Sequence, residues 1–414
     1  MRLALLSPLP PEQTGIADYA AHFRAALNQA GVEVLTPLAG QRPLDTLAAA
    51  EAWVAERDWR RIDVVHAELG GGRHSEFLTL CALAKLPKRP ALSATIHDPE
   101  RIVWRPVNRL WSALEHAPLV PRLARQAVAL LSDPHTLWAE RRLARQMDGL
   151  VALTGMGASR LAMRMRIDPH RVKVIPHGTL NIPAQPLPPL KPLRLLYFGF
   201  IYSGKGIEDL IDALGQVRAA HPEQAEHLRL TIAGGTAPDI AFGAQGSYLD
   251  SLRARVDALG LGAQVDWVLD VDESDIAGLV QRHHVMVLPY RESRKLSLLG
   301  QMRGTSGALA WAIACGRGAI TSDARAFAEE IKQGNGAAYP QGDVAALAAH
   351  LKSLLDEPAL ITAWAQRAAD LARQRVWSQT GQAFAHHFEA ACQRANPNPW
   401  GATKVSTLQG RESL

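Results

Sequence analysis

Residues 193–214 read LRLLYFGFIYSGKGIEDLIDAL, which is a strand, a glycine-rich turn and a helix in that order. Before and after this stretch, apolar runs of strand length alternate with helical patterns, and that alternation is typical of parallel sheets covered by helices. The predicted strands are residues 3–6, 64–66, 92–96, 149–153 and 172–175, and then 193–198, 228–233, 265–269, 285–288 and 319–321.

The strand pattern stops and starts again at a proline-rich segment. Residues 181–192 read NIPAQPLPPLKP, and their five prolines favour an extended, semi-rigid linker. We therefore predict an α/β protein of two tandem Rossmann-like domains facing a cleft, with residues 1–183 in the first and residues 193–375 in the second. Residues 376–395 are predicted to form a helix that crosses back, and residues 396–414 to be a disordered tail.

Composition narrows the class of protein. The 414 residues are 47% hydrophobic and contain no run of about 18 apolar residues that would span a bilayer. The apolar N-terminal residues 3–6 are too short for a signal peptide, so we expect a first core strand and a cytoplasmic protein. Three widely spaced cysteines (Cys81, Cys315 and Cys392) predict neither a disulfide framework nor a zinc site.

The net charge of +5 is concentrated in one stretch. Residues 101–146 contain eight arginines interleaved with Trp104, Trp111 and Trp138. Such a segment suits an anionic membrane surface, and a solvated helical insertion with its tryptophans in the core explains it equally well. No nucleic-acid-binding motif accompanies the charge, so we expect no nucleic-acid partner.

Loops that follow strands carry the candidate binding groups, because ligands of doubly wound sheets bind at the carboxyl ends of the strands. Gly15 lies in the loop after the first strand, where a helix begins beside it. Gly199 and Lys205 lie in the turn of the opening stretch, where one cation among glycines suits a diphosphate. A third segment, GTSGALAWAIACGRG at residues 304–318, opens a short helix. Its free N–H groups, together with Thr305, Ser306 and Gly307, are predicted to hold a diphosphate from a second side.

The order of these pieces resembles family 4 of the retaining glycosyltransferases over nearly the whole chain, to about residue 395. The matching motifs are Thr14-Gly15-Ile16, the ATIHDPE segment with His97 and Asp98, Pro176-His177-Gly178, the turn with Lys205, LRLTIAGG, HHVMVLPYRES and ACGRGAITSD. The resemblance implies the GT-B fold, a nucleotide-sugar donor and a saccharide or lipid-linked acceptor. It also implies that Lys205 binds the donor diphosphate and that His97 lines the sugar site.

Three positions depart from the family pattern. Phe200 stands where the family usually has an arginine, and Arg303 and Trp311 stand where it usually has two glutamates. These departures leave the identity of the donor open.

Two further clusters bear on the site. His66, Glu68 and Gly71, with Asp98, are predicted to line the acceptor side. Asp270-Val271-Asp272 spells the D-x-D pattern of metal-dependent transferases, but an acidic turn before a helix also explains it, and we expect no metal.

The sequence thus predicts a metal-independent hexosyltransferase that acts with retention and needs no cofactor beyond the nucleotide-sugar. We expect it to serve cell-surface polysaccharide or lipopolysaccharide assembly at the inner face of the membrane. Two alternatives stay open: a glycosyltransferase-like binding subunit without turnover, and a sugar-nucleotide epimerase on the same fold.

Overall fold

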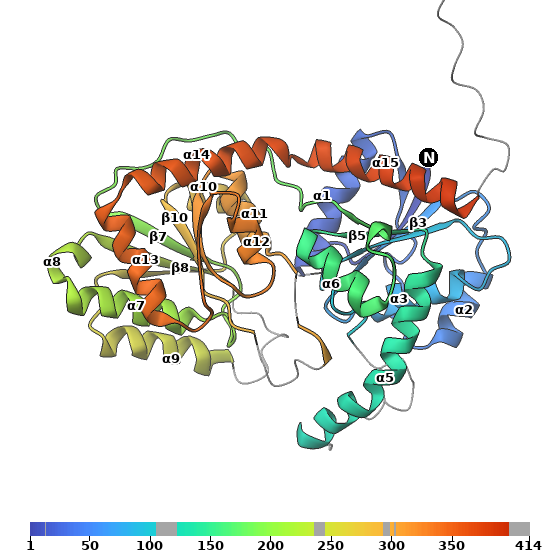
Figure 1. Cartoon of the computed structure of the whole chain (residues 1–414), viewed down its shortest axis with the longest axis horizontal. Coiled ribbons are helices and arrows are strands. Elements are labelled where there is room, and N and C mark those ends of the chain that lie inside the picture. The colour runs from blue at the N-terminus through green and yellow to red at the C-terminus, as the bar shows by residue number, and fades with distance from the viewer. Residues whose placement is uncertain (13, 105–121, 236–244, 293–298, 302–303, 397–414) are drawn as a thin grey trace, which may run out of the picture.

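The computed structural model contains two parallel sheets, each with helices on both faces (Figure 1). It describes every residue except 13, 105–121, 236–244, 293–298, 302–303 and 397–414. The predicted α/β fold with two Rossmann-like units is confirmed. Of the predicted tail, residues 397–414 lie outside the described residues.

The first sheet has the strand order β2-β1-β3-β4-β5-β6, and all its neighbours are parallel. Its central strands are apolar runs because helices cover both of their faces. The strands are β1 (Arg2–Leu6), β2 (Glu33–Leu35), β3 (Val64–Leu69), β4 (Ala91–Ile96), β5 (Gly149–Ala152) and β6 (Val172–Val174).

The second sheet has the order β12-β11-β10-β7-β8-β9 and is also parallel throughout. Its strands are β7 (Leu193–Phe198), β8 (Leu228–Gly234), β9 (Val265–Leu269), β10 (Val285–Leu288), β11 (Gly318–Ser322) and β12 (Gly336–Tyr339). Its helices are α7 (Ile207–Ala220), α8 (Pro222–Ala225), α9 (Gln245–Ala258), α10 (Glu273–Gln281), α11 (Gly307–Ala314), α12 (Phe327–Ile331), α13 (Val344–Asp356) and α14 (Ala359–Gln374).

Each sheet has one strand more than the sequence predicted. The additional strands, β2 and β12, lie at sheet edges. β2 has only three residues, two of them exposed, and β12 reads GAAY, with one buried residue. An edge strand with little buried surface needs no apolar run, and apolar runs were the signal used to find strands.

Helices from distant parts of the chain cover the two faces of the first sheet. One face packs on α2 (Leu47–Ala55), α3 (His74–Leu83), α5 (Arg122–Gln146) and α6 (Gly155–Met165). The other face packs on α1 (Gly15–Gln29) and on α15 (Trp377–Ala395), the last described helix of the chain. Figure 1 shows α14 over the second unit and α15 continuing over the first.

The chain crosses between the units twice, and the two crossings are paired. The Thr179 amide donates to the Arg375 carbonyl at 2.7 Å, and the Trp377 amide donates to the Thr179 carbonyl at 3.1 Å. The Thr179 hydroxyl also donates to the Ala372 carbonyl at 3.0 Å. The outgoing and returning segments are therefore held side by side.

The proline-rich linker is fastened to the second unit through its carbonyl groups. Because prolines have no N–H, this segment cannot pair along its length as a β-strand. Its carbonyl groups still need hydrogen-bond donors, and side chains of the second unit supply them. The donor–acceptor pairs are Gln281 to Pro183 (2.8 Å), Arg317 to Gln185 (3.3 Å) and Pro186 (3.1 Å), and His284 to Pro188 (3.1 Å).

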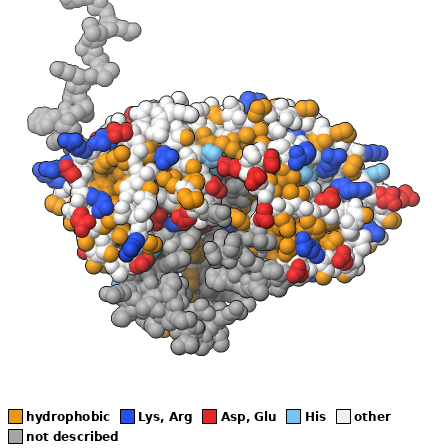
Figure 2. All heavy atoms as spheres, turned by 180° about the vertical axis from the view of Figure 1, so that it is seen from behind, with side chains coloured by type: hydrophobic (Ala, Val, Ile, Leu, Met, Phe, Trp, Pro, Cys, Tyr) orange, Lys and Arg blue, Asp and Glu red, His pale blue; other side chains and the backbone are white. Residues whose placement is uncertain are grey.

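Charges are mixed on the surface seen from behind. Lys and Arg side chains alternate there with Asp and Glu side chains, and they do not form one basic patch (Figure 2). None of the described helices is long and apolar enough to cross a lipid bilayer.

We predict that α15 is an integral part of the first unit's core. Phe384 is fully buried, and its ring centre lies 4.6 Å from that of Phe23 on α1. Phe384→Ala is expected to lower the free energy of unfolding of the first unit by about 3–5 kcal/mol, because it leaves a cavity. Urea unfolding measures this loss, with His386→Ala, at an exposed position of the same helix, as the control. Equal unfolding midpoints for the two variants would contradict the assignment.

Candidate active site

The candidate site lies where the carboxyl ends of the two sheets approach each other. In each sheet the strand order reverses at one place, between β1 and β3 in the first and between β7 and β10 in the second. Ligands of open parallel sheets bind at such switch points. The loops after these strands carry most of the predicted site residues.

Gly304 joins the two units at this place. A Cβ atom at Gly304 would lie 2.4 Å from the His97 carbonyl oxygen and 3.0 Å from Asp98 Oδ1, so no larger residue fits without a shift. The backbone before α11 in the second unit therefore touches the loop after β4 in the first. This contact brings the predicted His97 close to the predicted segment that begins at Thr305.

His97 is anchored by a buried carboxylate. Its Nε2 lies 2.8 Å from Glu68 Oε2, and the other oxygen, Oε1, lies 3.1 Å from His66 Nε2. His66 and Glu68 are fully buried, whereas 14% of the His97 side chain is exposed. Because His66 and Glu68 are two residues apart on β3, both side chains point to the same face of the sheet. Because neither side chain is exposed, His66 and Glu68 cannot contact an acceptor directly in this structure. They lie behind His97 and support it.

Glu68 is held in its ionised form. Burial opposes ionisation, but hydrogen bonds from His66 and His97 more than offset it and lower the pKa of Glu68 to about 2. An ionised carboxylate only accepts, so each histidine donates from Nε2.

The network continues to the C-terminal helix. Ser93 Oγ lies 3.0 Å from His66 Nδ1 and 3.2 Å from His387 Nε2. Burial lowers the pKa of His387 to about 3, so its imidazole is neutral at pH 7. With His387 donating to Ser93 and Ser93 donating to His66, a continuous series of polar contacts runs from α15 to His97.

Tyr19 packs beside His97, and it was not among the residues predicted for the site. Its ring centre lies 4.9 Å from that of His97, 5.0 Å from that of His177 and 5.0 Å from that of Trp377. The ring is buried, and its hydroxyl has no hydrogen-bond partner among the described residues. A buried hydroxyl without a partner costs free energy unless a ligand or water completes it.

The other residues predicted for the first unit lie in turns around His97. Asp98 is buried, and its Oδ2 accepts from the Gly71 amide at 3.1 Å. Gly15 begins α1 behind the cap residue Thr14, and a Cβ added to it would meet open space. Gly71 and Asp98 thus support the loop that carries His97, and Gly15 faces outward at a helix N-terminus.

The donor-side groups of the second unit meet at Tyr290, which follows β10. Lys205 Nζ lies 3.7 Å from the centre of the Tyr290 ring, and a Cβ at Gly199 would lie 3.5 Å from the Tyr290 hydroxyl. The turn is tight: Gly206 has φ +66°, and a Cβ there would lie 1.9 Å from the Pro289 carbonyl oxygen. Burial, with a smaller contribution from Arg325, lowers the pKa of Lys205 to about 7.

The start of α11 completes this cluster. Ser306 is the N-cap residue, but its side chain makes no capping bond, and its Oγ lies 3.4 Å from the Tyr290 hydroxyl. Gly307 is exposed, and a Cβ there would meet nothing within 4 Å. Thr305, which precedes Ser306 in the sequence, is half-buried. Lys205, Tyr290 and Ser306 are thus linked, with the amides of a helix start beside them.

The three residues that depart from the family pattern differ in their surroundings. Phe200 is 37% exposed and packs near Gly235. Trp311 lies on α11 and packs against the core of the second unit. Arg303 lies outside the described residues.

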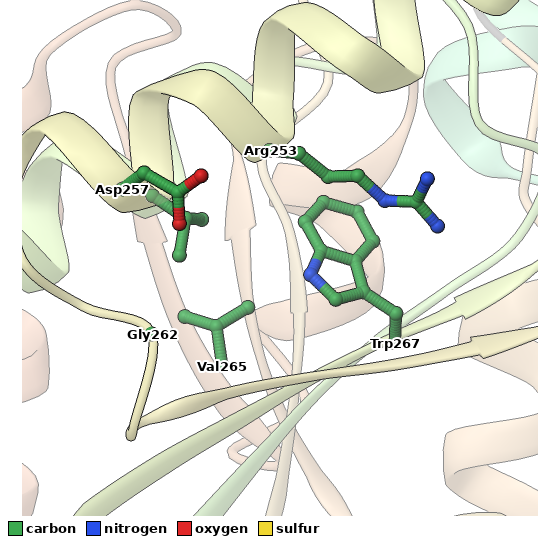
Figure 3. A pocket seen from close by; sticks show the side chains of 6 residues that line it. Arg253, Asp257, Gly262, Val265 and Trp267 are labelled. Carbon is green, nitrogen blue, oxygen red and sulfur yellow. The ribbon is translucent and has the colours of Figure 1, made fainter.

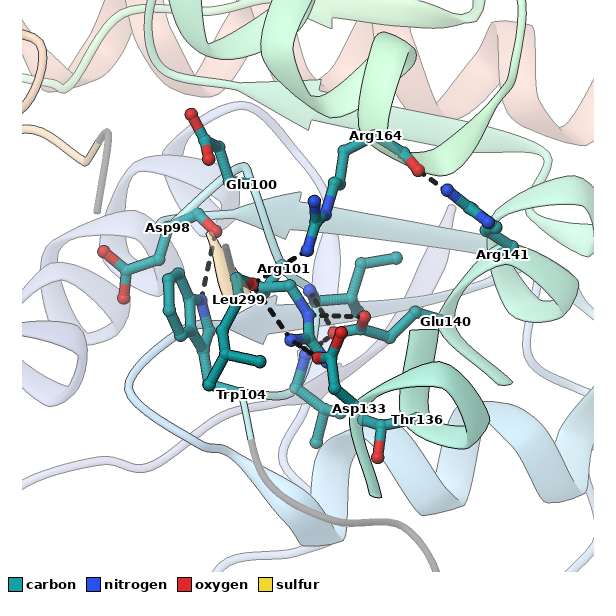
Figure 4. A network of polar contacts seen from close by, with 12 residues as sticks. Asp98, Glu100, Arg101, Trp104, Asp133, Thr136, Glu140, Arg141, Arg164 and Leu299 are labelled. Atoms are coloured by element: carbon teal, nitrogen blue, oxygen red, sulfur yellow. Dashed lines mark hydrogen bonds and ion pairs between the residues drawn. The ribbon is translucent and has the colours of Figure 1, made fainter. Parts of the chain in front are cut away.

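A buried arginine fixes the loop after β4 to α5 (Figure 4). Arg101 pairs with Asp133 and, at 2.7 Å, with Glu140, and it donates to the Leu299 carbonyl of the second unit at 3.1 Å. Arg164 donates to the same carbonyl at 3.0 Å. Arg101 was counted in the basic stretch 101–146, for which a membrane surface and a solvated helical insertion were both open. It is 4% exposed and serves the contact between the units, so Arg101 itself is not available to a membrane.

A second contact between the units involves Glu329 of α12. Its carboxylate accepts from the amides of Gly155 at 2.7 Å and Met156 at 2.6 Å, the first two residues of α6. A carboxylate suits the positive end of a helix dipole. The second unit therefore caps a helix of the first.

One further hollow lies away from the switch points. It is formed by α9 and β9, where the Arg253 guanidinium lies 5.7 Å from the centre of the Trp267 ring (Figure 3). It contains none of the predicted site residues.

Comparisons with known proteins agree with this arrangement. The model described as Glycosyltransferase Family 4 matches residues 13–179, and the model described as Glycosyl transferases group 1 matches residues 179–371. Glycogen synthase of Mycobacterium tuberculosis is 30% identical over 208 residues, which are 48% of this chain and 43% of that protein. The chain thus spans less than half of that relative's length.

Solved structures share the fold over nearly the full chain. Sucrose-phosphate synthase from Thermosynechococcus elongatus has a TM-score of 0.67 at 17% identity, covering 94% of this chain and 98% of its own. Anabaena HepE in complex with UDP-glucose has a TM-score of 0.62 at 18% identity, covering 94% and 100%. At these identities the two structures establish the fold alone.

Replacing the buried carboxylate makes a pH-dependent prediction. Because the pKa of Glu68 is lowered from 4.5 to about 2, its ionised form stabilises the fold above pH 4.5, and this contribution is lost as pH falls toward 2. Glu68→Gln is expected to lower the free energy of unfolding by about 1–3 kcal/mol at pH 7. The difference from the unchanged protein should shrink below pH 4.5.

Urea unfolding between pH 7 and pH 3 measures this difference. Glu389→Gln, at an exposed position of α15, is the control and should show a small difference at every pH. A Glu68→Gln deficit that stays constant across the range would show that the charge of Glu68 contributes nothing.

Proposed function

Since the chain belongs to the family 4 and group 1 glycosyltransferases with the GT-B fold, we propose that it transfers a hexosyl group from a nucleotide-sugar to a saccharide or lipid-linked acceptor. The observation that carries the proposal is the junction at Gly304. It brings the His97 loop of the first unit against the segment leading to Ser306 of the second.

The donor diphosphate is assigned to the second unit. Lys205 supplies a cation, and the start of α11 supplies N–H groups and the Ser306 hydroxyl beside it. Fixed donors aimed at a leaving diphosphate are worth most where water is excluded, and Lys205 is 9% exposed. UDP-glucose is the first donor to test, because the solved structure of HepE contains it.

Transfer is proposed to proceed with retention. The bond from the anomeric carbon to the diphosphate oxygen breaks while the acceptor oxygen bonds to that carbon from the same face. The acceptor proton passes to the departing phosphate oxygen, so no protein base is needed. Glu68 supports this route: its two oxygens accept from His66 and His97, and at a pKa of about 2 it is a poor base at pH 7. No cofactor and no metal take part.

His97 is assigned to positioning of the donor sugar or of the reacting hydroxyl. Its partly exposed ring is fixed through Nε2, and its backbone is fixed by the Leu69 carbonyl at 2.7 Å. An anchored imidazole holds a hydroxyl in place at little entropic cost, and such pre-organisation contributes much of the effect of a positioning group.

The acceptor is proposed to be part of a growing cell-surface polysaccharide or lipopolysaccharide, reached at the inner face of the membrane. On α5, Leu131 is 69% exposed and Trp138 is 57% exposed, and the Arg142 guanidinium lies 5.6 Å from the Trp138 ring centre. Figure 1 shows α5 extending away from the first sheet. An exposed Leu and Trp with arginines is the composition of a helix that lies on anionic lipid.

We predict that Lys205→Ala lowers the rate of sugar transfer about 100-fold or more, because the leaving diphosphate loses its cation. His97→Ala should lower the rate while leaving nucleotide affinity within about threefold. A screen of nucleotide-sugars by thermal shift selects the donor. Nucleoside diphosphate release with and without a saccharide acceptor then measures turnover, and Lys191→Ala, at an exposed linker position, is the control.

Two results would replace this proposal. Tight nucleotide-sugar binding without turnover, when a native acceptor is supplied, would identify a non-catalytic binding subunit. A changed sugar on the nucleotide in the absence of an acceptor would identify an epimerase.

We predict that the exposed face of α5 binds anionic membranes. The protein should float with phosphatidylglycerol vesicles at low salt, and Leu131→Glu combined with Trp138→Glu should abolish flotation without lowering the unfolding midpoint. Leu259→Glu, at an apolar position 40% exposed in the second unit, is the matched control. Equal flotation of the double variant and the control would rule out docking through α5.

A further inference from the structure

One aromatic ring of α1 lies where several distant parts of the chain meet. Tyr19 is buried, and rings that follow β4, follow β6 and begin α15 surround it. All three stand nearly edge-on to the Tyr19 ring, at interplanar angles of 86° (His97), 74° (His177) and 70° (Trp377). Edge-to-face contact is favourable, because the positive edge of one ring meets the negative face of another. Tyr19 therefore connects the His97 loop to the residues that flank the crossing at Thr179.

Two of these neighbours are fixed at the paired crossing between the units. His177 donates from Nδ1 to the Gly178 carbonyl at 2.6 Å, and burial lowers the pKa of His177 to about 4, so its ring is neutral at pH 7. The Trp377 amide donates to the Thr179 carbonyl at 3.1 Å. The Trp377 indole packs directly on Gly178, where an added Cβ would lie 2.4 Å from the ring atom Cδ2. Tyr19 thus packs against side chains that have little freedom to move.

His97 needs more than its hydrogen bond to keep one orientation. The 2.8 Å contact between Nε2 and Glu68 Oε2 fixes one atom of the ring, but it leaves the ring plane free to turn about that contact. The Tyr19 ring, 4.9 Å away between ring centres, blocks this rotation. Tyr19 cannot yield on its other side, because it stacks on Phe23 at 5.8 Å with an interplanar angle of 29°. Glu68 therefore fixes a point of the imidazole, and Tyr19 fixes its plane.

We propose that Tyr19 is a positioning residue that sets the orientation of the His97 ring for sugar transfer. The inference rests on the proposed function, in which His97 holds the donor sugar or the reacting hydroxyl. The ring of Tyr19 is the part that acts, because its hydroxyl is buried and has no hydrogen-bond partner among the described residues. Tyr19→Phe should therefore keep the function, and Tyr19→Leu should lose it.

The test compares Tyr19 with a buried aromatic residue that does not touch the site. Phe77 is fully buried in the first unit, in the core on the other face of the sheet. Tyr19→Leu and Phe77→Leu should both lower the unfolding midpoint, because each removes a buried ring. Tyr19→Phe should not lower it, because the hydroxyl that it removes has no described partner.

Release of UDP from UDP-glucose, or of nucleoside diphosphate from the donor that the thermal-shift screen selects, measures kcat with acceptor present. Tyr19→Leu should lower kcat about 10- to 100-fold, because misplacement of a positioned group by about 1 Å can cost about 100-fold. Tyr19→Phe should keep kcat within threefold, and Phe77→Leu within twofold. UDP affinity, measured by calorimetry, should stay within twofold in all three variants, because the diphosphate is assigned to the second unit.

A double variant tests whether Tyr19 acts through His97. If it does, Tyr19→Leu has no further effect on kcat in the His97→Ala background, so the two losses are not additive. Additive losses, or equal kcat values for Tyr19→Leu and Phe77→Leu, would overturn the role of Tyr19 and leave the proposed function standing. Failure of the unchanged protein to release nucleoside diphosphate from every nucleotide-sugar, with a native acceptor supplied, would overturn the proposed function itself.

Discussion

The first sheet has two apolar faces, and the first 180 residues supply full cover for only one of them. The second face is closed by α1 together with α15, which arrives from the end of the chain after the whole second unit has been built. Without this cover the apolar side chains of β1, β3 and β5 would be exposed to water. The exposure would cost a free energy of about 25 cal/mol for each Å² of apolar surface. The return of α15 is therefore a condition for the fold of the first unit, and it also fixes which parts of the two units lie side by side.

The same helix contributes to the chemistry of the site. His387 on α15 lies 3.2 Å from Ser93, and from there polar contacts lead through His66 to Glu68 and His97. A buried carboxylate between two imidazoles is stable only when each partner is fixed and satisfied. The last helix thus supports the ring orientation of His97 from the face of the sheet that it covers, although His387 is about 290 residues away along the chain.

Sequence patterns predicted the fold well because strands covered on both faces leave long apolar runs. Lys205 was predicted because it lies in a glycine-rich turn after such a run, and His97 was predicted from the family resemblance; both remain predictions as site residues. Groups that depend on tertiary packing gave no signal. Tyr19 and Tyr290 read as ordinary core aromatics, and their neighbours are set by loops from other strands. Burial likewise decides that His66 and Glu68 lie behind the site rather than at its surface.

The paired crossings at Thr179 and Val376 have a mechanical consequence. Because both covalent connections pass through one short bridge, and the linker beyond it is fastened to the second unit, relative rotation of the units has a single pivot there. The contacts of Glu329 with the start of α6 and of Leu299 with Arg101 and Arg164 are separate from that pivot. Separation of the two units would break these contacts and leave the paired crossings intact.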